Sequence, residues 1–444
     1  MNQSFFSQNR VPVLYAGMAL LLVIVGVGQG WSVSLSILNL CLISAIMSLG
    51  VNMQWGYAGL FNVGVMGFAA LGGLAAVIVS MPPIHEAQAA GGSGILIGLL
   101  ILVATIFASI FVWKQFNKNK KLAYWLIFAV IAVGYVLGRV FFLPAVEAIE
   151  AVDPSVSGYL GGLGLPIVLA WPVGGLFAAG AAFVIGKVAL GLRSDYLAIA
   201  TLGISEIILY FIKNEEWLTR GVKNVNGLPR PVPYEVDLQQ AEWFQKLAAD
   251  WGMSVTEASS IFVKLCYAGL FIAVIAILMY LSETALRSPW GRMMRAIRDN
   301  ETAAAAMGKN VVKRHLAIFV IGSAVIGLAG AMLTTLDGQF TPVSYQPLRF
   351  TFLIWVMVII GGSGNNWGAM LGGFFIWFFW IEAEPIGLWL IDTLTSFMDG
   401  DHPLRLHLMD SAAHMRLMTV GIVLLVALRY FPEGLIPERT ARKA

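Results

Sequence analysis

The stretch LAIFVIGSAVIGLAGAMLTTL (316–336) carries no charged side chain. A helix needs roughly 20 mostly apolar residues to cross the hydrocarbon core of a bilayer, so this stretch is predicted to span a membrane. Reading outward from it by the same length predicts an all-α fold, a polytopic transmembrane helical bundle of about 10–12 spans. The candidate spans are 11–29, 33–51, 56–80, 94–113, 122–143, 167–190, 195–213, 261–281, 316–336, 350–362, 367–383 and 413–431.

The composition supports a surface that faces lipid. Of the 444 residues, 58% are hydrophobic and 12% are charged, about half of the ~25% usual in soluble domains. The net charge of +3 is too small to suggest nucleic acid as a partner. Cys41 and Cys266 both lie in apolar stretches, so neither a disulfide framework nor a metal site is predicted. The apolar run after Arg10 is longer than a signal-peptide core of about 7–15 residues, so the first span is expected to be retained.

Basic segments orient the predicted spans. An excess of Lys and Arg is typical of cytoplasmic loops. The loops 114–121 and 282–315 and the tail 439–443 are all basic. With twelve crossings these segments fall on the side of Arg10, so both termini are predicted to be cytoplasmic. The polar segment 214–260 then lies on the outer, periplasmic side, where it is too short for an independent domain and long enough for a cap or a docking surface.

The common catalytic motifs are absent from the sequence. The string nearest to a P-loop, GAAFVIGK (180–187), has five residues between its glycines instead of four and lies inside an apolar stretch. None of the five histidines has the H-E-x-x-H spacing of a zinc protease. The chain is therefore predicted to be a transporter subunit and not an enzyme, without a cofactor of its own. If ATP is used, partner subunits bind it.

Two glycine-rich stretches interrupt the apolar pattern. They are GYAGLFNVGVMGFAALGG (56–73) and GGSGNNWGAMLGG (361–373). Small residues allow close helix packing, and glycine breaks also mark the discontinuous helices at which transporters bind substrate. Both interpretations stay open for the first stretch. The amides of Asn365 and Asn366 favour a substrate pathway for the second, whose flanking spans are short enough to form one broken or re-entrant unit.

One acid lies near the middle of a predicted span. Glu206 occurs in LAIATLGISEIILYF (197–211), and a charged group at the centre of a membrane helix costs ~2.5–3.5 kcal/mol on insertion scales. Glu206 is therefore expected to face a polar cavity or a partner, or to be protonated, and a structural hydrogen bond between helices is the alternative. Thr201 and Ser205 lie about one turn away and are expected to extend a polar stripe. The candidate substrate-pathway residues are Asn62, Tyr196, Thr201, Ser205, Glu206, Asn226, Asn365 and Asn366.

The loop 282–315 has the features of a docking element. Ser288 followed by Pro289 predicts a helix start, and Asp299 and Gly308 are expected to cap and to end a second short helix. Its four consecutive alanines present a narrow face that another protein can approach closely. A solvated basic loop is the alternative. The candidate docking residues are Arg292, Arg295, Arg298, Asp299, Asn300, Glu301, Ala304, Ala305, Met307 and Gly308.

Four blocks of the chain carry a family resemblance. They are GYAGLFNVGVMGFAALGG (56–73), GLRSDYLAIATLGISEI (191–207), SPWGRMMRAIRDNETAAAAMG (288–308), and AIFVIGSAVIGLAGAM (317–332) leading to VMVIIGGSGNNWGAMLGG (356–373). In order and nature they resemble the LivM-type permeases of high-affinity branched-chain amino acid ABC importers. The ending ALRYFPEGLIP (427–437) is also of the family type.

The resemblance implies a permease that moves branched-chain or related amino acids across a bacterial inner membrane. It implies three kinds of protein partner: a second permease of similar fold, two cytoplasmic ATPase subunits that bind ATP, and a periplasmic substrate-binding protein. The short helix at 299–308 then matches the coupling helix that sits in an ATPase groove.

Two departures from the family pattern affect these expectations. Residues 83–165 resemble an insertion with two extra spans, placed after the N-terminal spans of 1–55 in a single permease domain of 1–444. The glycine-rich stretch that usually follows the seventh span appears as TRGVKNVNGLP (219–229), with fewer glycines. The substrate therefore stays open to urea, amides or polar amino acids. An ion-coupled secondary transporter is the competing class, for which Glu206 is nearly the only candidate charge relay.

Overall fold

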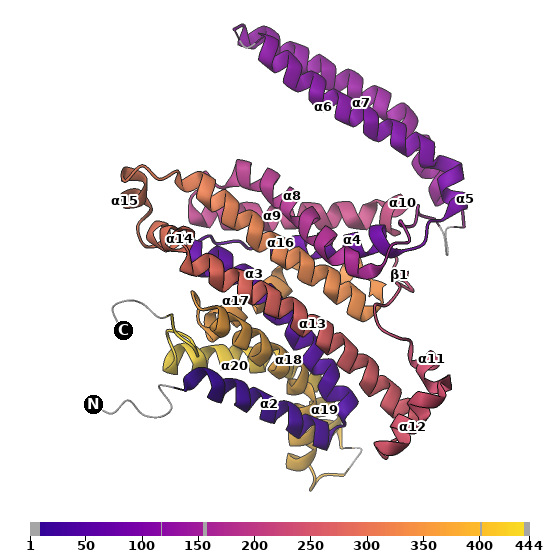
Figure 1. Cartoon of the computed structure of the whole chain (residues 1–444), viewed down its shortest axis with the longest axis vertical. Coiled ribbons are helices and arrows are strands. Elements are labelled where there is room, and N and C mark those ends of the chain that lie inside the picture. The colour runs from indigo at the N-terminus through magenta and orange to yellow at the C-terminus, as the bar shows by residue number, and fades with distance from the viewer. Residues whose placement is uncertain (1–8, 117, 154–157, 400–401, 439–444) are drawn as a thin grey trace.

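The computed structural model describes residues 9–116, 118–153, 158–399 and 402–438. Within these ranges nine helices are long and apolar enough to cross a membrane, or ten if the bent pair α19–α20 forms one span. The predicted all-α, polytopic bundle is therefore confirmed (Figure 1). The long helices are α2 (Arg10–Gly28), α3 (Trp31–Ala58), α6 (Ser93–Phe116), α7 (Lys120–Glu150), α8 (Ala170–Ala189), α9 (Ser194–Asn214), α13 (Val255–Arg287), α16 (Val311–Asp337) and α18 (Asn366–Leu394), and the bent pair is α19 (Pro403–Asp410) with α20 (Met415–Tyr430).

Two apolar helices are shorter than a full span, namely α4 (Val65–Ser80) and α17 (Pro347–Gly361). The remaining elements are short connections near the ends of the long helices. They are α5 (His85–Ala87), η1 (Gln88–Gly92), η2 (Ile167–Leu169), α10 (Glu216–Thr219), β1 (Val225–Asn226), α11 (Glu235–Gln240), α12 (Glu242–Asp250), α14 (Pro289–Asp299), α15 (Glu301–Ala306), β2 (Gln339–Phe340), η3 (Pro342–Ser344) and η4 (Ser411–His414).

The bundle has two distinct ends. Figure 1 places α14 and α15 at one end and α11 and α12 at the other. Both described ends of the chain lie toward α14, because Glu438 pairs with Arg298 at 3.0 Å and the Arg10 guanidinium lies 5.7 Å from the centre of the Phe431 ring. The predicted common side for both termini and the basic loop agrees with this arrangement.

Helix α16 lies at the centre of the bundle and packs against α3, α4 and α8. Small residues permit this packing. A Cβ atom on Gly72 of α4 would lie 1.8 Å from the carbonyl oxygen of Gly327 in α16, and one on Gly330 would lie 2.0 Å from the carbonyl oxygen of Ala69. The two backbones therefore touch, as is common where small residues line membrane helix interfaces.

The first glycine-rich stretch is a break between two helices. Helix α3 runs on to Ala58, and Gly59 ends it in the left-handed conformation with φ +70°. Glycine tolerates that conformation without a steric penalty, which makes it the usual residue after a helix end. Helix α4 begins only at Val65. The predicted span 56–80 therefore began too early.

The second glycine-rich stretch separates α17 from α18. Gly362 and Gly364 both have positive φ, at +116° and +80°, and the Asn365 side chain caps α18. A Cβ on Gly372 would meet the Met357 carbonyl oxygen at 1.9 Å, so the two helices fold back on each other as a tight hairpin. The predicted broken unit is present, although α18 extends eleven residues beyond the expected end at 383.

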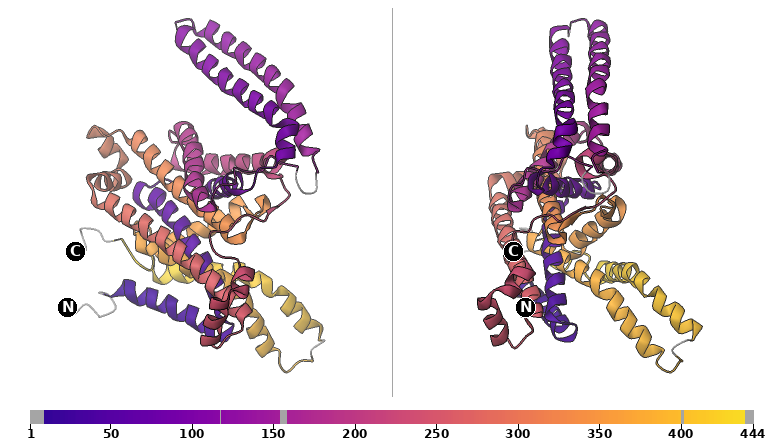
Figure 2. Two further views of the ribbon diagram at one scale, coloured as in Figure 1. Left: turned by 45° about the vertical axis from the view of Figure 1, so that its right-hand side comes forward. Right: turned by 90° about the vertical axis from the view of Figure 1, so that its right-hand side faces the viewer.

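Helices α6 and α7, within the predicted insertion 83–165, form a hairpin that stands apart from the bundle (Figure 2). Most of their apolar side chains are exposed. The buried cluster that includes Ile95, Ile149 and Trp217 joins the hairpin to the rest of the chain near α5. The hairpin is long enough to span a membrane, and its exposed apolar side chains are suited to contact with lipid.

Candidate functional site

The predicted loop 282–315 is shorter than expected and contains two helices. Helix α13 continues to Arg287 and α16 begins at Val311, so residues 288–310 form the connection. The predicted start at Ser288 is correct, because its hydroxyl oxygen accepts a hydrogen bond from the Trp290 backbone N–H at 3.2 Å. Pro289 occupies the first helical position of α14, where its missing N–H costs nothing.

The cap of the second short helix differs from the prediction. The Asn300 side chain accepts from the Ala303 backbone N–H at 2.9 Å, whereas Asp299 is the last residue of α14. Asp299 instead pairs with Arg298 at 3.2 Å. Gly308 follows α15 with φ +77°, in the conformation expected of a residue that ends a helix.

Helices α14 and α15 differ in how they meet the bundle. Gly291, Met294 and Ile297 of α14 are buried against α3 and α13. Helix α15 buries none of its residues, and the Met307 side chain that follows it is 80% exposed. The connection therefore consists of one anchored helix and one helix in which every residue is at least partly exposed.

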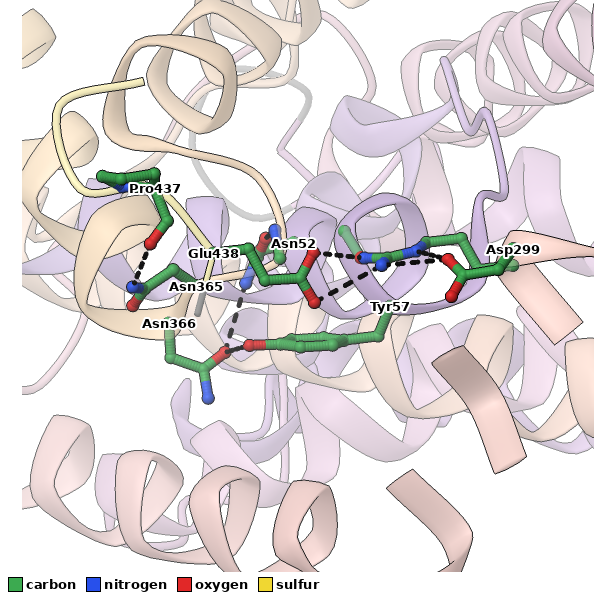
Figure 3. A network of polar contacts seen from close by, with 10 residues as sticks. Asn52, Tyr57, Asp299, Asn365, Asn366, Pro437 and Glu438 are labelled. Atoms are coloured by element: carbon green, nitrogen blue, oxygen red, sulfur yellow. Dashed lines mark hydrogen bonds and ion pairs between the residues drawn. The ribbon is translucent and has the colours of Figure 1, made fainter. Parts of the chain in front are cut away.

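Arg298 is the main polar anchor of α14. Its guanidinium donates to the carbonyl oxygen of Gly56, at the end of α3, and to the Glu438 carboxylate (Figure 3). Burial alone would lower the pKa of Arg298, but hydrogen bonds and Coulombic attraction from Glu438 and Asp299 raise that pKa overall, so the charge is held. Arg292 and Arg295 instead donate to the backbone carbonyls of Arg287 and Leu286.

The break between α17 and α18 lies directly beside this anchor. Asn52 of α3, which is fully buried, accepts from the Gly364 backbone N–H at 2.9 Å and donates to the side-chain amide oxygen of Asn366 at 3.2 Å (Figure 3). Tyr57 donates to the same Asn366 oxygen at 3.1 Å, and Asn366 donates to Glu283 of α13 at 3.1 Å. These side chains supply the hydrogen bonds that a broken helix leaves unmade.

The structure thus brings together two groups of residues that were predicted separately. Asn365 and Asn366, expected in the substrate pathway, lie at the α14 end with the docking candidates Arg298 and Asp299. Asn365 also donates to the Pro437 carbonyl oxygen at 3.1 Å, which ties the C-terminal segment to the break.

A second polar cluster fills the break between α3 and α4. Asn62, fully buried, donates to the Gln54 amide oxygen at 2.8 Å and accepts from the Gly64 backbone N–H at 2.9 Å. Thr201 of α9 accepts from the Val63 backbone N–H at 3.0 Å. The indole N–H of Trp355 in α17 donates to the Asn62 carbonyl oxygen at 2.9 Å. Two of the candidate pathway residues, Asn62 and Thr201, therefore meet here.

The polar stripe expected on α9 does not form. Thr201 and Ser205 are buried. The Ser205 hydroxyl has no hydrogen-bond partner within the described ranges. Glu206 is exposed on another face of the helix, as is Tyr196. The reason is helical geometry, since consecutive residues point about 100° apart.

Asn226 lies far from these residues, in β1. It pairs with Gln339 of β2, at the end of the bundle opposite α15. Several important residues were missed by sequence reasoning, namely Asn52, Gln54, Tyr57, Trp355 and Glu438. The two amides at 52 and 54 follow directly on a predicted span, which was the available signal for them.

The family model and several similar proteins that match this chain describe permeases of branched-chain amino acid transport. The model of the family described as branched-chain amino acid transport system / permease component matches residues 148–428. The probable branched-chain amino acid transport permease protein LivM of Methanocaldococcus jannaschii is 26% identical over 401 residues, which cover 89% of this chain and 90% of that protein.

Two Escherichia coli proteins are similar over shorter stretches. The high-affinity branched-chain amino acid transport system permease protein LivM is 30% identical over 233 residues, which cover 50% of this chain and 52% of that protein. The LivH permease protein of the same organism is 25% identical over 175 residues, or 39% of this chain and 50% of that protein. No match is found among solved structures.

Replacing Arg298 tests the anchor. Arg298→Ala removes the hydrogen bonds to Gly56 and Glu438, and hydrogen bonds to charged groups are each worth about 1.5–3 kcal/mol. We expect a lower melting temperature of the purified protein and faster proteolysis of its C-terminal segment. Arg287→Ala is the matched control, because the Arg287 side chain is 83% exposed. Equal melting temperatures for the two variants would contradict the anchoring role.

Proposed function

Because this chain belongs to the family of permease components of branched-chain amino acid transport systems, we propose that it is one membrane-spanning subunit of an ATP-driven importer of branched-chain or related amino acids. The exposed helix α15 beside the anchored helix α14 is the observation that carries this proposal. A permease that receives the work of ATP hydrolysis from other subunits needs a rigid contact surface on one end of its bundle.

In this proposal, α15 docks into a groove on a cytoplasmic ATPase subunit. Alanine side chains let the partner approach the α15 backbone closely, and Met307 adds a flexible apolar contact. Force applied to α15 passes through α14 to Arg298, and from there to the end of α3 and to the C-terminal segment. ATP itself is bound by the two ATPase subunits.

A second permease covers the exposed face of α9. Glu206 lies near the middle of this span-length helix, where contact with lipid alone is costly for a carboxylate. A partner helix with a polar group, or a water-filled path between two permeases, removes that cost. A periplasmic binding protein delivers substrate at the opposite end, where β1, α11 and α12 lie. Both termini are then cytoplasmic.

Enlarging α15 tests the docking role. Contacts in a packed groove tolerate little added volume, and overpacking typically costs about 1–3 kcal/mol. We expect Ala304→Trp and Ala305→Asp to lower both ATPase co-purification and transport by about tenfold, which corresponds to about 1.4 kcal/mol. Membrane abundance should stay unchanged, because α15 buries no residue in its own chain.

The matched control for these variants is Ala249→Asp, an exposed alanine of α12 at the opposite end of the bundle. It should leave ATPase co-purification and membrane abundance intact. Normal ATPase co-purification with both α15 variants would contradict the docking role. Residues 288–310 would then be an ordinary solvated basic loop.

Replacing Glu206 tests the face toward the second permease. Glu206→Leu replaces the carboxylate with an apolar side chain that lipid accommodates. We expect this variant to reduce co-purification of the second permease or the rate of transport. Glu206→Gln keeps hydrogen-bonding capacity and should retain more of both. If Glu206→Leu assembles and transports like the unchanged protein at every pH tested, the exposed face of α9 contacts lipid and not a partner.

A further inference from the structure

A cavity of about 240 Å³ lies among α3, α4, α16, α17 and α18 and opens beside β2 and η3, at the end of the bundle opposite α15. We call it the outer cavity. Its lining includes Met66, the second residue of α4 after the break between α3 and α4. The outer cavity therefore reaches the start of α4, next to the break.

The walls and the mouth of the outer cavity differ in chemistry. The walls are apolar and flexible, with side chains such as Ile43, Met66 and Met357. The mouth is polar and includes Asp337, Gln339 and Ser344. Unbranched thioether side chains adapt to ligands of different shape. A solute with one charged end and one aliphatic end fits this division, whereas a sugar would find few partners along its body.

Asp337 carries a charge that the fold leaves uncompensated. It is the last residue of α16, where the aligned peptide dipoles place partial negative charge, so a carboxylate is unfavourable there and a cation is favoured. None of the ion pairs among the described residues includes Asp337. Arg230 lies near Gly338 but pairs with Glu235 at 2.9 Å.

Two residues that line the cavity also carry a buried polar atom without a hydrogen-bond partner. The Thr341 hydroxyl and the indole N–H of Trp377 are shielded from solvent and make no hydrogen bond within the described part of the chain. A buried donor without a partner costs about 1–3 kcal/mol, so such atoms are rare unless a ligand or water satisfies them. Both can donate to a carboxylate.

We propose that the outer cavity binds the amino acid during transport, with the Asp337 carboxylate accepting hydrogen bonds from the α-ammonium group and the methionine-lined walls taking the aliphatic side chain. The proposal rests on the importer function proposed above and adds the binding site within this subunit. Its volume is below the ~300–1,000 Å³ of pockets for drug-sized ligands, as suits a small solute.

The path to this cavity passes the outer polar segment. Asn226 of β1 pairs with Gln339 at the mouth, and the Leu228 backbone N–H donates to the Gly338 carbonyl oxygen at 3.2 Å. The segment 214–260, which is predicted to form a cap or a docking surface, therefore borders the entrance through β1 and Leu228. Through its pairing with Gln339, Asn226 lies beside the mouth of the proposed pathway.

Thiol protection in the purified importer, with all its partner subunits, tests occupancy directly. Ser344→Cys places a thiol at the exposed mouth, after Cys41 and Cys266 are replaced by serine. Leucine should slow its reaction with a membrane-impermeant thiol reagent at least about fivefold. 4-Methylpentanoate, which lacks only the amino group, should not slow it. Adding Asp337→Asn should abolish protection by leucine, whereas Asp337→Glu should keep part of it.

Uptake into proteoliposomes gives the second readout. Asp337→Asn should lower leucine uptake about tenfold, equivalent to about 1.4 kcal/mol, with unchanged assembly and unchanged ATP hydrolysis stimulated by the loaded binding protein. The control Asp410→Asn removes an exposed carboxylate at the end of α19, outside both the cavity lining and the segment 214–260, and should transport normally.

The outcomes separate the two proposals. If the unchanged importer transports leucine but leucine fails to protect the Ser344→Cys thiol, or if Asp337→Asn transports normally, the cavity is not the binding site and the importer function stands. If the unchanged importer hydrolyses ATP yet transports no amino acid, both proposals fall.

Discussion

Inside a bilayer every backbone N–H and C=O group must find a partner within the protein, and this chain interrupts its helices at two places where that requirement is demanding. Buried amide side chains meet it at both. Asn52 bonds the backbone at Gly364 in the break between α17 and α18, and Asn62 bonds the backbone at Gly64 in the break between α3 and α4. Both amides belong to one continuous segment of chain, so the two breaks are mechanically connected.

The two breaks lie beside different parts of the molecule. The α17–α18 break touches Arg298 and Glu438, and so lies against the helix pair that is proposed to receive the ATPase. The α3–α4 break is followed closely by Met66, which lines the outer cavity, and lies beside the contacting rings of Trp55, Phe61 and Trp355. Side-chain networks that join rigid helices are the physical means by which two distant sites can bias each other. In the proposed importer, movement of α14 would therefore reach the floor of the cavity through α3.

Much of this architecture was predictable, and the failures have physical causes. Apolar length located the helices, and Ser288 with Pro289 located the start of α14. The third span was placed too early because apolar residues continue through the break at Gly59. Asn300 and not Asp299 caps α15, because both are good caps and only the backbone geometry distinguishes them. The pairing of Arg298 with Glu438 joins residues 140 positions apart, which periodicity along the chain cannot reveal.

In the proposed importer, α15 and the mouth of the outer cavity face opposite sides of the membrane. The direct test labels single thiols from one side, using Met307→Cys beside α15 and Ala249→Cys in α12, both at exposed positions. In intact, sealed cells an impermeant reagent should modify the Ala249→Cys variant alone, and in inside-out vesicles the Met307→Cys variant alone. Modification of both variants from the same side would contradict the account.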